Sequence, residues 1–207
     1  MTERTATGAG GTDAAILDVA ERLVQKRGFN GFSYADIAGE LSITKASLHY
    51  HFPSKADLGE ALLDRYSERF SASLAAIRDG GAPAGDMLRA YAGLYASVLA
   101  EQRMCLCGML AAEYETLPDP MQEAIVRFFD LNEVWLQDVL TRGRREGTLA
   151  FQGTPREVAR AIVAGLEGAM LVARAQGRAD GFGSSAERLV QGLAGASAPR
   201  RRSGAAG

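Results

Sequence analysis

Apolar residues recur at every third or fourth position along most of the chain, which is the spacing of one buried face on an α-helix. The first such segment carries Ile16, Val19, Ala20 and Leu23. Gly28 follows it directly after two basic residues, as is typical of a helix end. This pattern predicts a first helix from residue 12 to residue 27, preceded by a flexible arm over residues 1–11.

Two shorter helical segments follow, and the residues that begin them are good helix caps. Ser33 precedes an apolar stripe and has Asp36 three residues later, which makes a capping box. Thr44 begins the next segment, and Pro53 ends it because the residue before a proline avoids helical geometry. Ser54 then begins a fourth, longer segment. Three short helices with a tight turn between the second and third predict a helix-turn-helix.

Glycine and proline clusters divide the rest of the chain into five further helical segments. We expect these helices near residues 85–102, 105–116, 120–146, 155–176 and 185–195. The best-defined start is at Thr154, because the cap Thr154, the first-turn Pro155 and Glu157 three residues past the cap all agree. No strand pattern of useful length appears, so we predict an all-α fold of about nine helices.

The predicted organisation is a helix-turn-helix domain over residues 12–56, a larger helical-bundle domain over residues 57–195 and a disordered tail over residues 196–207. The tail contains Arg200, Arg201 and Arg202. These arginines fit either a solvated tail or an extension that contacts phosphate.

Composition limits the classes of function. The formal net charge is −2 and the sequence pI is about 5.8. These values exclude a chain coated with nucleic acid, which would need many clustered Lys and Arg, so any DNA-binding patch must be local. Glu167 and Arg174 interrupt the most apolar segment before it could span a bilayer, and no signal-peptide pattern is present. We therefore expect a cytoplasmic protein that does not enter a membrane.

The stretch SLHYHFPSK, residues 47–55, concentrates side chains that could carry chemistry. His49 and His51 are two positions apart, so about 200° of helix rotation separates them and they cannot share one metal ion. No thiol or carboxylate cluster lies close by in sequence, so we expect neither a metal site nor acid–base catalysis. Leu48 and Phe52 belong to a buried face. The other faces carry hydroxyl, imidazole and lysine groups that suit phosphate and base edges.

The run from residue 14 to residue 61, AAILDVAERLVQKRGFNGFSYADIAGELSITKASLHYHFPSKADLGEA, resembles the DNA-binding domain of the TetR family of bacterial transcriptional regulators. Its densest part is ADIAGELSITKASLHYHFPSKADL. The resemblance implies an N-terminal helix-turn-helix whose third helix lies in the major groove of double-stranded DNA. It also implies a helical C-terminal domain that binds a ligand and forms a dimer.

The resemblance further implies which side chains meet the DNA. Residues of the recognition helix would face bases, and the later ones would face bases or phosphates. They are Thr44, Lys45, Ala46, Ser47, His49, Tyr50 and His51. Residues at the starts of the second and fourth helices would contact the DNA backbone. They are Ser33, Tyr34 and Lys55.

Two residues depart from the family pattern. The family commonly has tyrosine where His49 stands, so Tyr50 or a protonated His49 would have to supply the phosphate contact there. The family commonly has glycine where Ser42 stands, in the turn between the second and third helices. If this position needs a positive φ, the serine costs about 1 kcal/mol or reshapes the turn.

Residues 155–176 contain AIVAGLEGAMLVA, which is apolar on nearly every side of a helix. Such a helix must be buried all round, either inside one subunit or partly against a second copy. In TetR-like proteins the last two long helices form a four-helix dimer interface, which implies a homodimer that reads a palindromic operator. The expected interface residues are Ile162, Leu166, Met170, Leu189 and Leu193. Small residues of the same region would let another backbone approach, namely Ala161, Gly165, Gly168 and Ala169.

Aromatic and methionine side chains gather between the helix-turn-helix and these last helices. Such residues at helical spacing form either plain core or the lining of a ligand pocket. Related regulators bind their inducers in this segment, which favours a pocket for an unknown small-molecule inducer. The expected lining is Tyr91, Tyr95, Met104, Met109, Tyr114, Phe128, Phe129 and Trp135.

Cys105 and Cys107 are too few and too close for a disulfide framework and cannot chelate a metal by themselves. They are either small buried hydrophobic residues or, as in some TetR-like regulators, sensors of oxidants or electrophiles. A sensor needs an exposed, stabilised thiolate, which Arg103 would favour and Glu101 would oppose.

The sequence thus predicts a DNA-binding repressor without a cofactor, released from its operator by a small molecule or by cysteine modification. One alternative is a helical ligand-binding or enzymatic protein whose helix-turn-helix is only structural. Another is an architectural DNA-binding protein without sequence preference, which the acidic overall charge disfavours.

Overall fold

The computed structural model describes residues 9–194, and within this range it is built from helices joined by short loops, with one isolated bridge between Leu149 and Ala194. The elements in chain order are α1 (Ala9–Arg27), α2 (Tyr34–Leu41), α3 (Lys45–His51), α4 (Lys55–Asp79), α5 (Ala84–Ala100), α6 (Leu106–Ala111), the 3-10 helix η1 (Tyr114–Thr116), α7 (Asp119–Arg145), α8 (Pro155–Ala175) and α9 (Ala179–Gln191). The prediction of an all-α fold is confirmed for the described residues.

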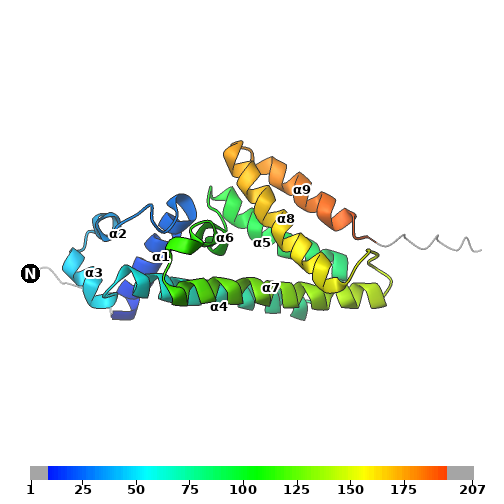
Figure 1. The fold of residues 1–207 in the computed structure, drawn as a ribbon, viewed down its shortest axis with the longest axis horizontal. Coiled ribbons are helices and arrows are strands. Elements are labelled where there is room, and N and C mark those ends of the chain that lie inside the picture. The colour runs from blue at the N-terminus through cyan, green and yellow to red at the C-terminus, as the bar shows by residue number, and fades with distance from the viewer. Residues whose placement is uncertain (1–8, 195–207) are drawn as a thin grey trace, which may run out of the picture.

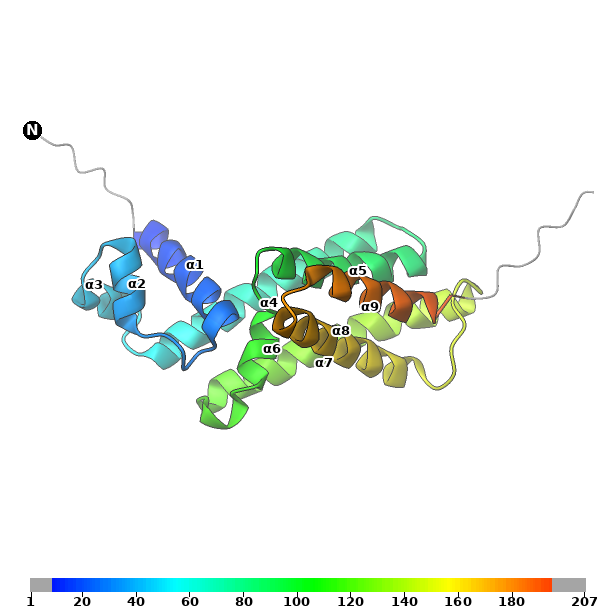
Figure 2. The ribbon, with the colours of Figure 1, turned by 90° about the horizontal axis from the view of Figure 1, so that it is seen from above.

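The helices form two parts joined by α4 (Figure 1). Helices α1 to α3 and the start of α4 lie at one end of the molecule, and α5 to α9 lie at the other (Figure 2). The long helices α4 and α7 pack along each other, while α8 packs on α7 and on α9, which also contacts α5. The expected domain boundary between residues 56 and 57 falls in the first turn of α4, so one continuous helix connects the two parts.

The predicted caps are confirmed, which explains why the helices begin where they do. Capping boxes form at Ser33, at Ser54 and at Thr154, and the Thr44 side chain accepts a hydrogen bond from the Ser47 amide at 3.0 Å. Gly28 ends α1 with a φ of 82°, a conformation that favours glycine. These local signals determine where the helices of the helix-turn-helix begin and end, and they do not depend on packing against the rest of the fold.

Three predicted boundaries differ from the structure. Helix α1 begins at Ala9, so the expected arm is helical over its last residues; positions 1–8 and the expected tail, 196–207, lie outside the described residues. The single helix expected over 105–116 is divided into α6 and η1, because Glu113 turns its carboxylate to the amides of Phe29 and Asn30. Helix α9 begins at Ala179 rather than 185, because Phe182 is buried beside α5 despite the neighbouring glycines.

No helix of the described residues is both long and apolar enough to cross a membrane.

Candidate functional site

Helix α3 presents a surface of polar and aromatic side chains to solvent. Leu48 is fully buried and anchors the helix on α1 and α2, so the opposite side faces outward. Lys45, Ala46 and His49 are exposed, and Tyr50 is 83% exposed, which is unusual for a tyrosine with no partner to cover it. We call these four residues the α3 face. They are four of the seven residues that the resemblance assigns to DNA contact on the recognition helix; of the other three, Thr44 is exposed and Ser47 and His51 are half-buried.

The turn before α3 fixes its direction. Ser42 has φ 55° and ψ 38°, so the serine occupies the left-handed conformation where the family commonly has glycine. Its amide donates to the last carbonyls of α2, and the Ile43 amide donates to the Ala38 carbonyl at 3.0 Å. The turn therefore keeps its shape, and the serine costs about 1 kcal/mol relative to glycine.

The two histidines of α3 have different surroundings. His49 lies beside the ring of Tyr34, and its Nδ1 donates to the Pro53 carbonyl at 3.0 Å. A carbonyl only accepts, so Nδ1 carries a proton, and Nε2 is left free towards solvent. His51 instead turns its Nδ1 to the carboxylate of Asp13 on α1, and its side chain is only 12% exposed. The structure therefore leaves His49 available to DNA and engages His51 inside the subunit.

The side chain of Tyr34 points inward, although the resemblance implies that this residue contacts the DNA backbone from the start of α2. The residue is buried, and its hydroxyl donates to the carbonyls of Phe52 at 2.8 Å and Ser54 at 2.6 Å. Burial, helped by the charge of Asp57, raises the pKa of Tyr34 to about 12. The hydroxyl thus ties α2 to the α3–α4 junction and positions the recognition helix.

Lys55 is also turned inward, although the sequence placed it against phosphate. Its ammonium donates to the carbonyls of Phe29 at 2.5 Å and Phe32 at 2.6 Å, and lies 4.2 Å from the centre of the Phe32 ring. Desolvation lowers the pKa of Lys55 in spite of nearby carboxylates. In this conformation Lys55 holds the α1–α2 loop, and a phosphate contact would require it to give up these carbonyls.

Ser33 stays at the surface as expected. Its amide and its hydroxyl both donate to the Asp36 carboxylate at 2.7 Å, which lowers the pKa of Asp36. The exposed first turn of α2 therefore remains a candidate contact to the DNA backbone, through its amides rather than through the serine hydroxyl.

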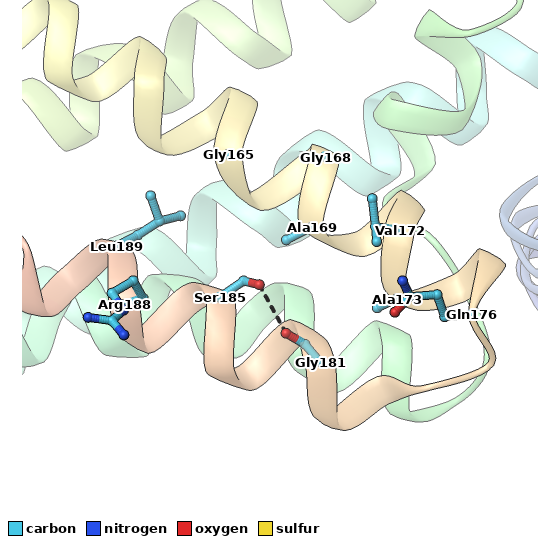
Figure 3. Close-up of a pocket in the computed structure, with 10 residues that line it drawn as sticks. All are labelled: Gly165, Gly168, Ala169, Val172, Ala173, Gln176, Gly181, Ser185, Arg188 and Leu189. Atoms are coloured by element: carbon cyan, nitrogen blue, oxygen red, sulfur yellow. Dashed lines mark hydrogen bonds between the residues drawn. The ribbon is translucent and has the colours of Figure 1, made fainter.

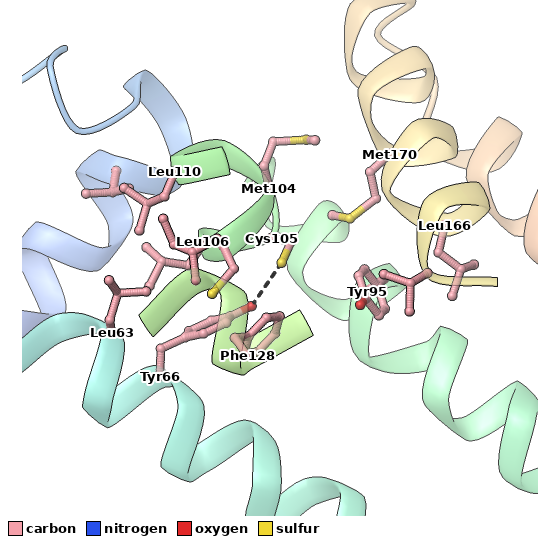
Figure 4. Packing of buried hydrophobic residues seen from close by; sticks show 14 of the residues in the cluster. Leu63, Tyr66, Tyr95, Met104, Cys105, Leu106, Leu110, Phe128, Leu166 and Met170 are labelled. Carbon is pink, nitrogen blue, oxygen red and sulfur yellow. Dashed lines mark hydrogen bonds between the residues drawn. The ribbon is translucent and has the colours of Figure 1, made fainter. Parts of the chain in front are cut away.

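The aromatic residues of the bundle pack into one cluster. Tyr91 stacks on Trp135 at 5.5 Å between ring centres, and its hydroxyl lies 3.0 Å from that of Tyr95 and donates to Asn132 at 2.8 Å. Phe128 and Met104 are also buried in this region (Figure 4). Five of the eight predicted ligand residues are therefore buried, and four of them are aromatic residues that pack against one another or against Phe70.

The other three predicted ligand residues lie at the edge of the cluster. Phe129 packs edge-on against Phe128. Met109 and Tyr114 are half-buried near the junction with α1, and the guanidinium of Arg174 lies 3.4 Å from the Met109 sulfur. The structure does not bring these residues to one cavity with Tyr91 and Tyr95.

The two thiols lack the exposure that a redox sensor requires. Cys105 is 2% exposed and Cys107 is 0% exposed, and the Tyr66 hydroxyl lies 3.7 Å from the Cys105 sulfur (Figure 4). Burial and the neighbouring Glu167 raise both thiol pKa values well above the usual range. Arg103, the expected stabilising cation, pairs with Glu101 and Gln25 instead. Both cysteines are core residues in this conformation.

Three of the five expected dimer residues, all on α8, are turned into the subunit. Ile162, Leu166 and Met170 are buried inside the subunit, where Leu166 and Met170 approach Tyr95 (Figure 4). Only Leu189 is left partly exposed on α9, together with Leu193 just beyond its end. The sequence could not distinguish the two apolar sides of α8.

The outward side of α8 and α9 forms a shallow groove instead (Figure 3). Its volume is about 450 Å³, and it is lined by Gly165, Gly168, Ala169, Val172, Ala173, Gln176, Gly181, Ser185, Arg188 and Leu189. Val172, which lines the groove, is 55% exposed. Gly165 lets Leu189 approach from α9 within the subunit, whereas nothing lies within 4 Å of a Cβ placed on Gly168. Small and apolar residues therefore form an open face.

Residues of the bundle form hydrogen bonds with the end of α1 and the loop that follows it. The sequence did not predict these contacts. The Gln25 carbonyl accepts from the Met104 amide at 3.2 Å and from Arg174 on α8 at 3.3 Å. Glu113 accepts from the Phe29 amide at 2.6 Å. We call these contacts the α1 joint. The joint links α8 and the α6 region directly to the helix-turn-helix.

Glu167 on α8 is a second feature that the sequence did not identify as a site, because in the sequence it only interrupts an apolar segment. Its Oε1 is buried without a hydrogen-bond partner. Burial raises the pKa of Glu167 to about 7, and the Cys105 thiol lowers it in part. The sequence signal that could have identified this residue is a single carboxylate within an otherwise apolar helix, because a buried charge is costly unless it has a partner.

No group of three or more His, Cys, Asp and Glu side chains within residues 9–194 is arranged to hold a metal ion.

Two family models match the chain and together cover both of its parts. Residues 16–62 match the model of bacterial regulatory proteins of the tetR family. Residues 84–188 match the tetracyclin repressor-like C-terminal domain.

Known proteins resemble the chain along most of its length. A TetR-family transcriptional regulator from Agrobacterium tumefaciens is 34% identical, with a TM-score of 0.87 over 90% of this chain and 100% of that one. The transcriptional regulator AcuR of Cereibacter sphaeroides is 28% identical over 77% of this chain and 74% of its own length. The transcriptional repressor NemR of Escherichia coli is 26% identical over 77% of this chain and 82% of its own length. The chain belongs to the TetR family of transcriptional regulators, and it is a ligand-responsive DNA-binding protein.

Proposed function

We propose that this regulator is a homodimeric repressor that binds a palindromic operator and leaves it when a small molecule enters the bundle. The observation that carries the proposal is the α3 face: Lys45, His49 and Tyr50 are exposed on a helix that is fixed by a buried Leu48 and a capped first turn. Such a rigid, outward helix suits the major groove.

We assign the proposed DNA contacts to side chains that point to solvent and are not already engaged by other parts of the domain. Lys45 would neutralise phosphate, and Ser47, His49 and Tyr50 would meet bases or phosphates. Ser33 would bring the first turn of α2 to the backbone. Thr44 and Ala46 would lie beside the bases. Tyr34, His51 and Lys55 would act as positioning residues, because their polar atoms already serve the domain itself.

A second copy would pack on the open face of α8 and α9. This face is apolar and carries small residues, so two helix pairs could approach closely there. Two α3 helices about 34 Å apart would then read the two halves of a palindrome.

The α1 joint offers a way for ligand binding in the bundle to change the position of the helix-turn-helix. Arg174 and the α6 region contact the end of α1, so a ligand that shifts α6 or α8 would tilt the helix-turn-helix. A coupling of about 1–3 kcal/mol would be enough to change operator affinity by one or two orders of magnitude. We favour a small molecule over cysteine modification as the trigger, because both thiols are buried and hold their protons.

The test is selection of bound sequences from random duplex DNA, followed by affinity measurements against salt concentration. An enriched palindrome is expected from this proposal. An intact, folded protein that enriches no sequence would refute it, and would favour the alternative of a ligand-binding or enzymatic protein whose helix-turn-helix is only structural.

A further inference from the structure

Glu167 lies inside the bundle with an oxygen that nothing in the subunit satisfies. The carboxylate occupies the space that a side chain on Gly108 would fill, so it points from α8 to the start of α6. Its Oε1 has no hydrogen-bond partner and is buried. Among residues 9–194 no basic group forms an ion pair with it. Within the described residues, the molecule therefore keeps a partly buried carboxylate whose Oε1 is enclosed, and it supplies no cation to that oxygen.

Four weakly acidic side chains lie close enough for the charge of Glu167 to affect them. Tyr91 and Tyr95 come from α5, and Cys105 and Cys107 come from the α6 region; the charge of Glu167 raises the pKa of all four. None of them can neutralise an anion. The nearest arginine along the same helix face, Arg174, donates to the carbonyls of Gln25 and Lys26 instead.

The surroundings of Glu167 suit an organic cation better than a metal ion. Within the described residues, the carboxylate and the two thiols are not arranged to hold a metal. The Tyr95 ring packs against Phe70 with 6.1 Å between ring centres, and Tyr91 packs against Phe70 at 6.2 Å. Aromatic faces attract organic cations. The carbon groups of such a cation are further stabilised by contact with apolar side chains.

A route to this region begins at the surface between α1, α4 and α5. A cavity of about 170 Å³ lies there, and Tyr66 and Phe70 form part of its lining. The Tyr66 hydroxyl reaches Cys105, and Phe70 contacts the two tyrosines on the bundle side. The half-buried Phe70 ring thus lines the cavity and also contacts the two tyrosines, and the volume of the cavity suits a small ligand.

We propose that Glu167 anchors an effector site for a small organic cation, a protonated alkylamine, whose ammonium group donates to the free Oε1 and whose carbon chain packs against Tyr95 and Phe70. This assignment rests on the proposed function, since it identifies the class of molecule that would release the operator. Binding would shift α8 relative to α6, the two elements that meet at the α1 joint.

The test is calorimetric titration of the full-length protein with straight-chain alkylammonium chlorides from ethyl to hexyl. The alcohols and carboxylates of the same chain lengths serve as neutral and anionic controls. At least one ammonium ion is expected to bind at least about tenfold more tightly than its alcohol, because a hydrogen bond to a charged group contributes more than a neutral one. Glu167→Gln is expected to remove this preference, and Glu123→Gln, at an exposed position on α7, is expected to retain it.

The pH dependence gives a measurement that does not require a variant. Alkylammonium ions stay charged well above neutral pH, as lysine does with a pKa of about 10.4, so only the protein titrates between about pH 6 and pH 8. Affinity in the wild-type protein is expected to rise over this range as Glu167 loses its proton. Equal binding of alcohol and ammonium ion, absence of any ammonium binding, or an affinity that does not change with pH would overturn the assignment.

The two proposals fail in different ways. A protein that enriches an operator but binds no alkylammonium ion refutes the ligand class alone. A protein that binds the ion through Glu167 but enriches no DNA sequence refutes the proposed function and leaves the site in place.

Discussion

Replacing Glu167 with glutamine is expected to stabilise the folded protein above neutral pH. The change keeps the size of the side chain and removes its titration. In the folded protein the pKa of Glu167 is about 7, against an ordinary value of 4.5, and burial is the main cause. Because the folded state holds the proton more tightly than the unfolded state, protonation stabilises the fold fully below about pH 4.5. This stabilisation is lost as the pH rises through about 7.

The size of the effect follows from the difference between the two pKa values. The gap between 4.5 and about 7 corresponds to about 3 kcal/mol of unfolding free energy, at 1.36 kcal/mol for each unit. The wild-type protein should lose this amount relative to Glu167→Gln between about pH 4 and pH 8. For a chain of this length the corresponding change in the Tm difference is about 6–12 °C.

Urea denaturation and thermal unfolding at several pH values provide the assay. Protein concentration must be constant, because dimer formation would add to the apparent stability. Glu123→Gln is the matched control, since it makes the same substitution at an exposed position on α7. A stability difference between wild type and Glu167→Gln that stays constant across the range would refute the reasoning, because it would mean that the carboxylate is solvated in the folded state.

Three further predictions concern DNA binding, assembly and the thiols. Lys45→Ala should weaken binding to all duplexes alike and reduce the slope of log K against log salt by about 1, measured by fluorescence anisotropy; an unchanged slope would remove Lys45 from the phosphate contacts. Val172→Arg should give monomers in sedimentation equilibrium while Val134→Arg, at an exposed site on α7, should not; a dimer in both would place the interface elsewhere. Cys105 and Cys107 should react with a thiol reagent more slowly than a free peptide cysteine until the protein unfolds, and fast labelling of the native protein would restore the sensor hypothesis.

The helical class and the helix-turn-helix could be derived from the sequence because their signals are local. A cap such as Ser33 or Thr154 satisfies amides within its own first turn, and apolar spacing along one helix already selects the buried face. The sequence left open whether Ser42 has a positive φ or the turn is reshaped, and the structure shows the positive φ. These features depend on neighbours a few positions away, so no knowledge of the packing was needed.

The roles of individual side chains depended on contacts between distant segments. Lys55 points to carbonyls of the α1–α2 loop, and Arg174 reaches the end of α1 from α8, contacts that span many residues of chain. Leu166 and Val172 lie on opposite sides of a helix that is apolar almost all round, so periodicity could not tell the core from the open face. Glu167 acquires its raised pKa only because α8 carries it into the bundle beside the α6 region. Burial and long-range partners are properties of the packed molecule, and they decide which polar groups remain free for DNA, for a second subunit or for a ligand.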